Sequence, residues 1–147
     1  MTKPGRLILP LACLLAGAGS ADAPLLHTTA LSWEDVQATP LSPNGRTRRL
    51  LQSATATLDE LEVHVTTLPP GQASHAPHKH PEEEVIIVKE GTVEAFLAGE
   101  KRRLGPGSVM FMASEELHNV TNVGDTPATY HVMQWFSPGW KKKAEAR

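Results

Sequence analysis

The composition of the chain limits its size class and its partners. Its 147 residues suit one ordinary domain, because a second hydrophobic core would be too small to stand alone. The 14 basic and 16 acidic residues leave a formal charge of -2, without a basic stripe that could track a phosphate backbone. We therefore expect no nucleic-acid partner. The 12 prolines and 11 glycines favour short strands and tight turns, an all-β fold, over a helical bundle.

The first 23 residues have the pattern of a secretory signal peptide. Two basic residues precede an apolar run over residues 7–16, and small residues then continue to Ala23. The run is too short, and too interrupted by Pro10, to cross a bilayer, which takes about 20 helical residues. We expect cleavage after Ala21 or Ala23, and a mature protein that is periplasmic or extracellular with no stable membrane span.

Cys13 is the only cysteine and lies inside this segment. The mature domain would then contain no thiol and no disulfide. Lipid attachment at Cys13 stays open as an alternative, although the usual leucine three positions before a lipid-modified cysteine is missing. In an oxidising compartment such a domain depends on its core and on any metal that it binds.

The chain after the signal begins with an N-terminal extension over residues 24–57. We expect a short helical turn after Ser32, a Pro-Asn-Gly turn at residues 43–45 and an edge strand at residues 47–52. From Leu61 to Thr67, apolar and polar residues alternate. This period of two predicts a half-buried strand with His64 on its exposed face.

Short strands then recur about every ten residues, which is typical of a β sandwich or barrel. The β-branched run at residues 85–88, the turn at residues 89–91 and the returning strand at residues 92–97 predict a hairpin. Further strands are expected at residues 102–104, 109–112, 118–123 and 128–136. We assign residues 58–136 to the barrel and residues 137–147 to a basic C-terminal tail.

The histidines cluster where a metal site could form. Four of the seven lie between His75 and His118. Residues two apart in an extended segment point to the same side, so His78 and His80 can present nitrogens to one point. Glu84 keeps this parity, and His118 opens a later strand. Three neutral imidazoles and one carboxylate suit one divalent transition metal, such as Mn, Fe, Ni, Co or Zn, and leave positions open on an octahedral ion.

The spacing of these residues resembles the first motif of the cupin superfamily, here Gly71 followed by His78-x-His80-x3-Glu84-x6-Gly91. The resemblance spans about residues 58 to 136. It implies a double-stranded β-helix, which is a jelly-roll-like antiparallel β-barrel. It also implies a metal site at the barrel mouth and a homodimer.

The second cupin motif is recognisable in an altered form. Counted from Gly107, the sequence has Ala113-Ser-Glu115 where many cupins have Pro-x-Gly, and then His118-x3-Asn122. Neither this change nor the long gap between Gly71 and His78 removes a ligand.

The resemblance implies a metal-dependent enzyme that acts on a small polar molecule. An oxygenase or oxidase and a non-redox lyase, isomerase or hydrolase remain open, since dioxygenase-like and aminohydrolase-like members share these motifs. His131 and Gln134 have opposite parity on the last strand, so at most one faces the cavity as a catalytic candidate.

The alternative is a non-catalytic exported small-ligand-binding protein or sensor. A titratable group that faces the cavity near the metal would favour the enzyme, and an apolar lining would favour binding. A purely structural metal site is less favoured, because such sites usually close with four Cys or His ligands.

Overall fold

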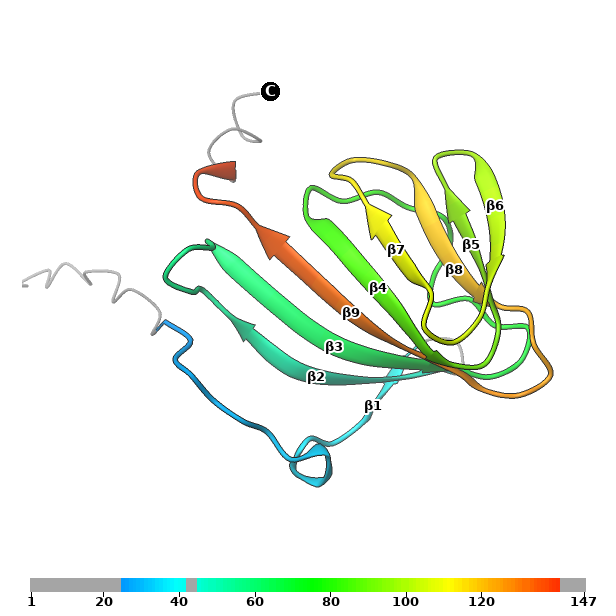
Figure 1. The fold of residues 1–147 in the computed structure, drawn as a ribbon, viewed down its shortest axis with the longest axis horizontal. Coiled ribbons are helices and arrows are strands. Elements are labelled where there is room, and N and C mark those ends of the chain that lie inside the picture. Colours follow the sequence, from blue (N-terminus) through cyan, green and yellow to red (C-terminus); the bar gives the residue numbers. More distant parts are fainter. Residues whose placement is uncertain (1–24, 42–44, 141–147) are drawn as a thin grey trace, which may run out of the picture.

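A computed structural model describes residues 25–41 and 45–140 of the chain. Within these ranges the chain forms one 3-10 turn and nine β-strands (Figure 1). They are η1 Trp33–Asp35, β1 Thr39–Leu41, β2 Gly45–Ser53, β3 Glu60–Leu68, β4 Glu83–Glu90, β5 Val93–Leu97, β6 Glu100–Leu104, β7 Val109–Met112, β8 His118–Asn122 and β9 Ala128–Phe136.

Some sequence predictions fall outside the described residues. The signal peptide over residues 1–23 and most of the basic tail, residues 141–147, are among them, as are the first two residues of the Pro-Asn-Gly turn. In the part that is described, no helix has the length and apolar character needed to cross a membrane.

The strands form two antiparallel sheets. The larger has the order β1-β2-β3-β9-β4-β7 and the smaller the order β6-β5-β8. The smaller sheet lies on the β4 and β7 side of the larger one (Figure 1). The buried apolar cluster comes from both sheets: Leu68, Ile86, Val88, Val93, Ala95, Met110, Met112, Val120, Ala128, Tyr130 and Val132. The predicted antiparallel β-barrel is confirmed.

Strand β4 illustrates how the sequence produces this core. Ile86 and Val88 are at most 3% exposed, whereas Ile87 between them is 36% exposed. Successive side chains of a strand point to opposite faces, so one face of this apolar run enters the barrel. Strand β9 pairs with β3 on one side and with β4 on the other, which places it in the middle of the larger sheet.

The expected edge strand at residues 47–52 is wrong only at its first residue. These residues belong to β2, and β1 pairs with its outer side from Thr39↔Thr47 to Leu41↔Gly45. From Arg48 onward, β3 is the only described strand that pairs with β2, so this part of β2 lies at the edge of the sheet. Strand β1 leaves little sign in the sequence, since a three-residue strand is too short to show a hydrophobic period.

The expected hairpin of residues 85–88 with residues 92–97 is also wrong. Strand β4 pairs with β7 and β9, whereas β5 pairs with β6 and β8 in the other sheet. Gly91 has a φ of 81°, and a Cβ at this position would lie 2.6 Å from the Cα of Ala128. The chain therefore uses Gly91 to cross between sheets in a space that holds no side chain.

The predicted exposed face of β3 is inside the barrel. Glu62, His64 and Thr66 line a cavity, and the His64 side chain is 19% exposed. The opposite face is covered as well, since Val65 is 2% exposed and shares a depression with Trp33 of the N-terminal extension. The prediction failed because alternation shows which residues share a face, and not which face meets the core.

Candidate metal centre

Backbone pairing brings two of the predicted ligands together. His78 lies in the loop before β4, and His118 is the first residue of β8. They form an isolated antiparallel bridge, in which the His78 N–H donates to the His118 carbonyl at 3.1 Å and the reverse bond is 2.9 Å. The loop therefore pairs with the start of β8, and both imidazoles are held at this end of the barrel.

The imidazoles of His78, His80 and His118 meet at one point. One nitrogen from each lies within 4.8 Å of the other two. The ring centroids of His78 and His118 are 4.7 Å apart, as are those of His80 and His118. Three histidines from a loop and a strand in this arrangement could bind a metal ion.

The hydrogen bonds of these histidines leave nitrogen lone pairs for a ligand. His118 Nδ1 lies 2.8 Å from the Glu116 carbonyl oxygen, and His80 Nδ1 lies 3.1 Å from that of Glu82. A carbonyl only accepts, so each Nδ1 carries a proton, and in the neutral imidazole Nε2 then has the lone pair. His118 Nε2 and His78 Nδ1 are buried and have no hydrogen-bond partner among the described residues. Buried polar atoms without partners are costly, and a metal ion would satisfy them.

Glu84 borders the same point from β4. Its side chain is buried, and its Oε2 lies 3.5 Å from His80 Nε2. Burial would raise the pKa of Glu84, but hydrogen bonds from His80 and Gln134 outweigh this and hold the pKa below its usual value. The bond to Glu84 in turn raises the pKa of His80. Glu84 is therefore a carboxylate at neutral pH, the form that binds a metal.

Burial, followed by the nearby His118 and His80, lowers the pKa of His78. A lowered pKa keeps the imidazole neutral near pH 7, and only a neutral imidazole can donate a lone pair to a metal. Taken with the orphaned nitrogens, the residues present fit a divalent metal ion. The assignment of His78, His80, Glu84 and His118 as ligands stays a prediction.

The two candidates on the last strand point to opposite faces. Gln134 lines the cavity and donates a hydrogen bond from its side-chain amide to Glu84. His131 is not among the residues that line the cavity and has the parity of the outer face. Gln134 is therefore the one placed beside the histidine cluster.

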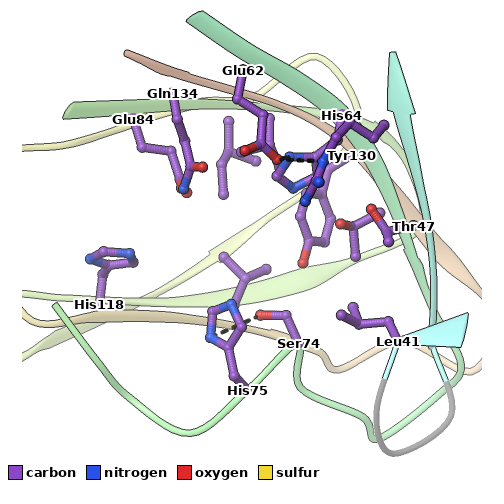
Figure 2. Close-up of a pocket in the computed structure, with 15 residues that line it drawn as sticks. Leu41, Thr47, Glu62, His64, Ser74, His75, Glu84, His118, Tyr130 and Gln134 are labelled. Atoms are coloured by element: carbon purple, nitrogen blue, oxygen red, sulfur yellow. Dashed lines mark hydrogen bonds and ion pairs between the residues drawn. The ribbon is translucent and has the colours of Figure 1, made fainter. Parts of the chain in front are cut away.

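The cavity beside the cluster has a volume of about 220 Å³. This is below the range of about 300–1,000 Å³ that is usual for drug-sized ligands, so it suits a small molecule. Figure 2 shows Glu84, Gln134, Glu62 and His64 along the larger sheet, and His118 on the other side of the cavity. Its polar lining comes from Thr47, Arg49, Glu62, His64, Thr66, Ser74, His75, Glu84, His118, Tyr130 and Gln134.

Sequence reasoning missed several of these lining residues. The alternation predicts an exposed face for His64, and therefore for Glu62, which shares that face, while no pattern in the sequence singles out Arg49 or Tyr130. The signal available was the parity of β3, which places Glu62, His64 and Thr66 on one face. A polar face on a strand that pairs on both sides can line a cavity as readily as it can face solvent.

Comparison with known proteins finds cupins, in sequence and in structure. The sequence model of the cupin domain family matches residues 64–134. An RmlC-like cupin from Shewanella frigidimarina is 14% identical, with a TM-score of 0.64, over 76% of this chain and 94% of that one. A polyketide cyclase from Streptomyces resistomycificus is 22% identical, with a TM-score of 0.62, over 76% of this chain and 82% of that one.

A third similar structure is a sugar phosphate isomerase of the cupin superfamily from Silicibacter pomeroyi. It is 20% identical, with a TM-score of 0.62, over 75% of this chain and 77% of that one. At these identities the similarity concerns the fold. No curated protein matched the sequence. Residues 64–134 therefore form a cupin domain.

Proposed function

We propose that this cupin is a metal-dependent enzyme that acts on a small polar molecule. The observation that carries the proposal is the convergence of three imidazole nitrogens at the wall of a small cavity that also contains other titratable side chains. His78, His80, His118 and Glu84 would hold one divalent transition metal. When bound, the ion would supply a Lewis acid with open positions for a substrate oxygen.

The residues of the chain account for the other needs of such an enzyme. The Glu116 and Glu82 carbonyls orient His118 and His80. Gln134 fixes the carboxylate of Glu84. Glu62, His64 and Tyr130 add further donors and acceptors to the cavity lining that can orient a polar substrate.

The polar lining supports an enzyme over the non-catalytic ligand-binding or sensor protein. A site built only to retain a ligand needs few ionisable groups, whereas proton transfer needs them near the reacting atoms. Two of the similar structures carry the names of enzymes, a polyketide cyclase and a sugar phosphate isomerase. Their range of chemistry leaves both the redox and the non-redox classes as candidates for this chain.

The test is a turnover assay with metal-loaded protein. A panel of small hydroxy, keto and carboxylic acids is incubated with it in air, and each compound is followed by NMR. We expect at least one compound to be converted by the wild-type protein and not by a His78→Ala variant. If the protein binds metal and retains one compound tightly without converting it, the binding-protein alternative is correct.

We propose further that the mature protein works outside the cytoplasm as a homodimer. Export rests on the charged, apolar and small-residue order of the first 23 residues. The homodimer rests on the resemblance to cupins. Cell fractionation with N-terminal sequencing tests the first, and light scattering after size-exclusion chromatography tests the second. A cytoplasmic, uncleaved protein or a monomer would contradict the respective proposal.

A further inference from the structure

A histidine and a glutamate that are not among the predicted ligands form a pair inside the cavity. His64 Nδ1 lies 3.1 Å from Glu62 Oε1, and the side chains are 19% and 16% exposed. Both residues lie on β3 and line the cavity. In Figure 2 the pair lies across the cavity from His118.

Strand register sets the pair at a fixed spacing from the histidine cluster. Glu62 is the register partner of Gln134 on β9, and Gln134 is the partner of Glu84 on β4. Neighbouring strands are about 4.8 Å apart, so the β3 and β4 backbones are separated by about 10 Å. The side chains of both strands project into this one cavity, so a molecule of a few carbon atoms can contact the pair and the cluster together.

The hydrogen bond determines which nitrogen of His64 is free to react. An ionised carboxylate only accepts, so Nδ1 carries the shared proton and Nε2 carries the lone pair. A carboxylate in this position also stabilises the imidazolium that forms when Nε2 takes up a proton. His64 and Glu62 thus have the arrangement of a general base and its positioning residue.

The surroundings of His64 keep it neutral until it reacts. Burial lowers the pKa of His64, against the opposing charges of Glu62 and Glu84, and Arg49 lowers it further. Arg49 faces His64 from β2 as its register partner, and its Nε lies 3.3 Å from Glu62 Oε1. From β9, the register partner of His64 is the uncharged Val132.

Tyr130 also lines the cavity, and it has a different role. It is 2% exposed, and burial raises the pKa of its phenol. Tyr130 therefore keeps its proton and can donate a hydrogen bond, but it cannot serve as a base near neutral pH.

We propose that Glu62 and His64 are the proton-transfer pair of this cupin and that its substrates are small carbonyl compounds with a hydrogen on the adjacent carbon. His64 Nε2 removes that hydrogen as a proton. The electrons of the broken C–H bond move into the carbonyl to give an enolate, and the imidazolium returns the proton to the same or the neighbouring carbon. No oxidant or reductant is consumed.

This inference rests on the proposed function, because the carbonyl end of the substrate would lie at the histidine cluster. It selects the non-redox branch of that function. The reason is that a neutral base and an oxygen-binding cluster in the same cavity are the two groups that proton abstraction beside a carbonyl requires.

The experiment measures exchange of carbon-bound hydrogen for deuterium. Pyruvate and dihydroxyacetone are incubated in D2O with metal-loaded protein, and the loss of their proton signals is followed by NMR. We expect exchange above the buffer rate in at least one of them. His64→Gln should slow it by about 100-fold or more with its metal content unchanged. The matched control is His131→Gln, a histidine outside the cavity, which should leave the exchange rate unchanged.

A second measurement uses metal-free protein and needs no activity. In 15N-histidine NMR, we expect His64 of the wild type to be the neutral Nδ1–H tautomer at pH 7. Glu62→Gln should shift the titration of His64 to lower pH, because the carboxylate that favours the imidazolium is lost. If His64 is the base, the pH profile of exchange in Glu62→Gln should shift by the same amount as the titration of His64. If the pair is only structural, the pH profile of exchange should not shift.

The outcomes separate this inference from the proposed function. Wild-type protein that binds no metal contradicts the proposed function, whatever the tautomer of His64. Fully loaded protein that exchanges neither compound, or that exchanges equally well as His64→Gln, overturns this inference alone. An Nε2–H tautomer or a His64 imidazolium at pH 7 overturns it as well.

Discussion

His78 and His118 exchange two backbone hydrogen bonds, 3.1 and 2.9 Å in length, and their imidazole centroids are 4.7 Å apart. Because the backbone fixes this pair, the rings cannot easily separate when one becomes charged. Burial and then the neighbouring histidines accordingly lower the pKa of His78. This relationship links the geometry of the cluster to the dependence of stability on pH.

We expect the metal-free protein to lose stability as the pH falls from 7 to 5. Burial is the largest cause of lowered pKa values at His64, His75 and His78, with His75 at about 4. The unfolded chain takes up these protons first, near pH 6.5, so acid favours unfolding. His80, whose pKa is raised, opposes the trend but is outnumbered.

Urea denaturation at several pH values in the presence of a chelator measures this effect. The free energy of unfolding should decline towards pH 5, and less steeply in a His78→Gln variant. A free energy that stays level or increases towards acid pH would show that these histidines are not held in their neutral forms.

The hydrogen bond from Gln134 to Glu84 should tune metal affinity. Gln134→Leu keeps the volume but removes the donor that orients the carboxylate. We expect Ni²⁺ affinity, measured by isothermal titration calorimetry, to fall by about 10- to 100-fold. Trp135→Phe is a matched control, since its indole donates to the non-ligand Glu83 at 3.0 Å. Equal affinities for the two variants would argue against a role for Gln134.

Gly91 should be intolerant of any side chain. Its φ is 81°, and an added Cβ would meet the Ala128 backbone at 2.6 Å. We expect Gly91→Ala to lower the free energy of unfolding by about 3 kcal/mol or more. Gly99→Ala is the control for φ alone, because φ is 99° there with nothing within 4 Å, and it should cost about 1–2 kcal/mol. Both free energies of unfolding are measured by urea denaturation. Similar losses in the two variants would show that contact with Ala128 does not add to the cost at Gly91.

Glu115 occupies a backbone conformation that favours glycine. Its φ is 64°, and it stands at the corner where many cupins have the glycine of Pro-x-Gly. Glu115→Gly removes strain of about 1–2 kcal/mol but gives the unfolded chain more freedom, so we expect a net gain of about 0.5–1 kcal/mol.

The same substitution also breaks the exposed ion pair with Lys79, which is 3.8 Å long and should contribute little. Lys79→Ala is the control for that loss. A Glu115→Gly variant less stable than the wild type, by thermal unfolding, would mean that the corner is not strained.

The sequence was sufficient for the strands but not for their pairing. The turn residues on either side placed β7 and β9 at the observed residues, because β7 is an apolar run and β9 begins with alternating apolar and polar residues. The predicted pairing of β4 with β5 is wrong, because the glycine at position 91 suggests a hairpin turn. What makes it a crossing point is its contact with Ala128, which lies far along the chain.

The convergence of the histidines followed from parity, but the position of Glu62 and His64 inside the cavity did not. His78 and His80 are two residues apart, and Glu84 keeps their parity, so a single extended segment could bring them together. Whether His64 is inside or outside depends on how the larger sheet curves and on what covers Val65. Both are tertiary effects that a local pattern does not contain.

The central claim is that His78, His80, Glu84 and His118 hold one divalent metal ion. Elemental analysis of protein purified from its native host tests it most directly. His78→Ala is analysed alongside, with His131→Ala as the control, because His131 lies outside the cavity. We predict a stoichiometric transition metal in the wild type and in His131→Ala, and its loss in His78→Ala. A metal-free wild type that takes up no Mn, Fe, Ni, Co or Zn on reconstitution would contradict the claim.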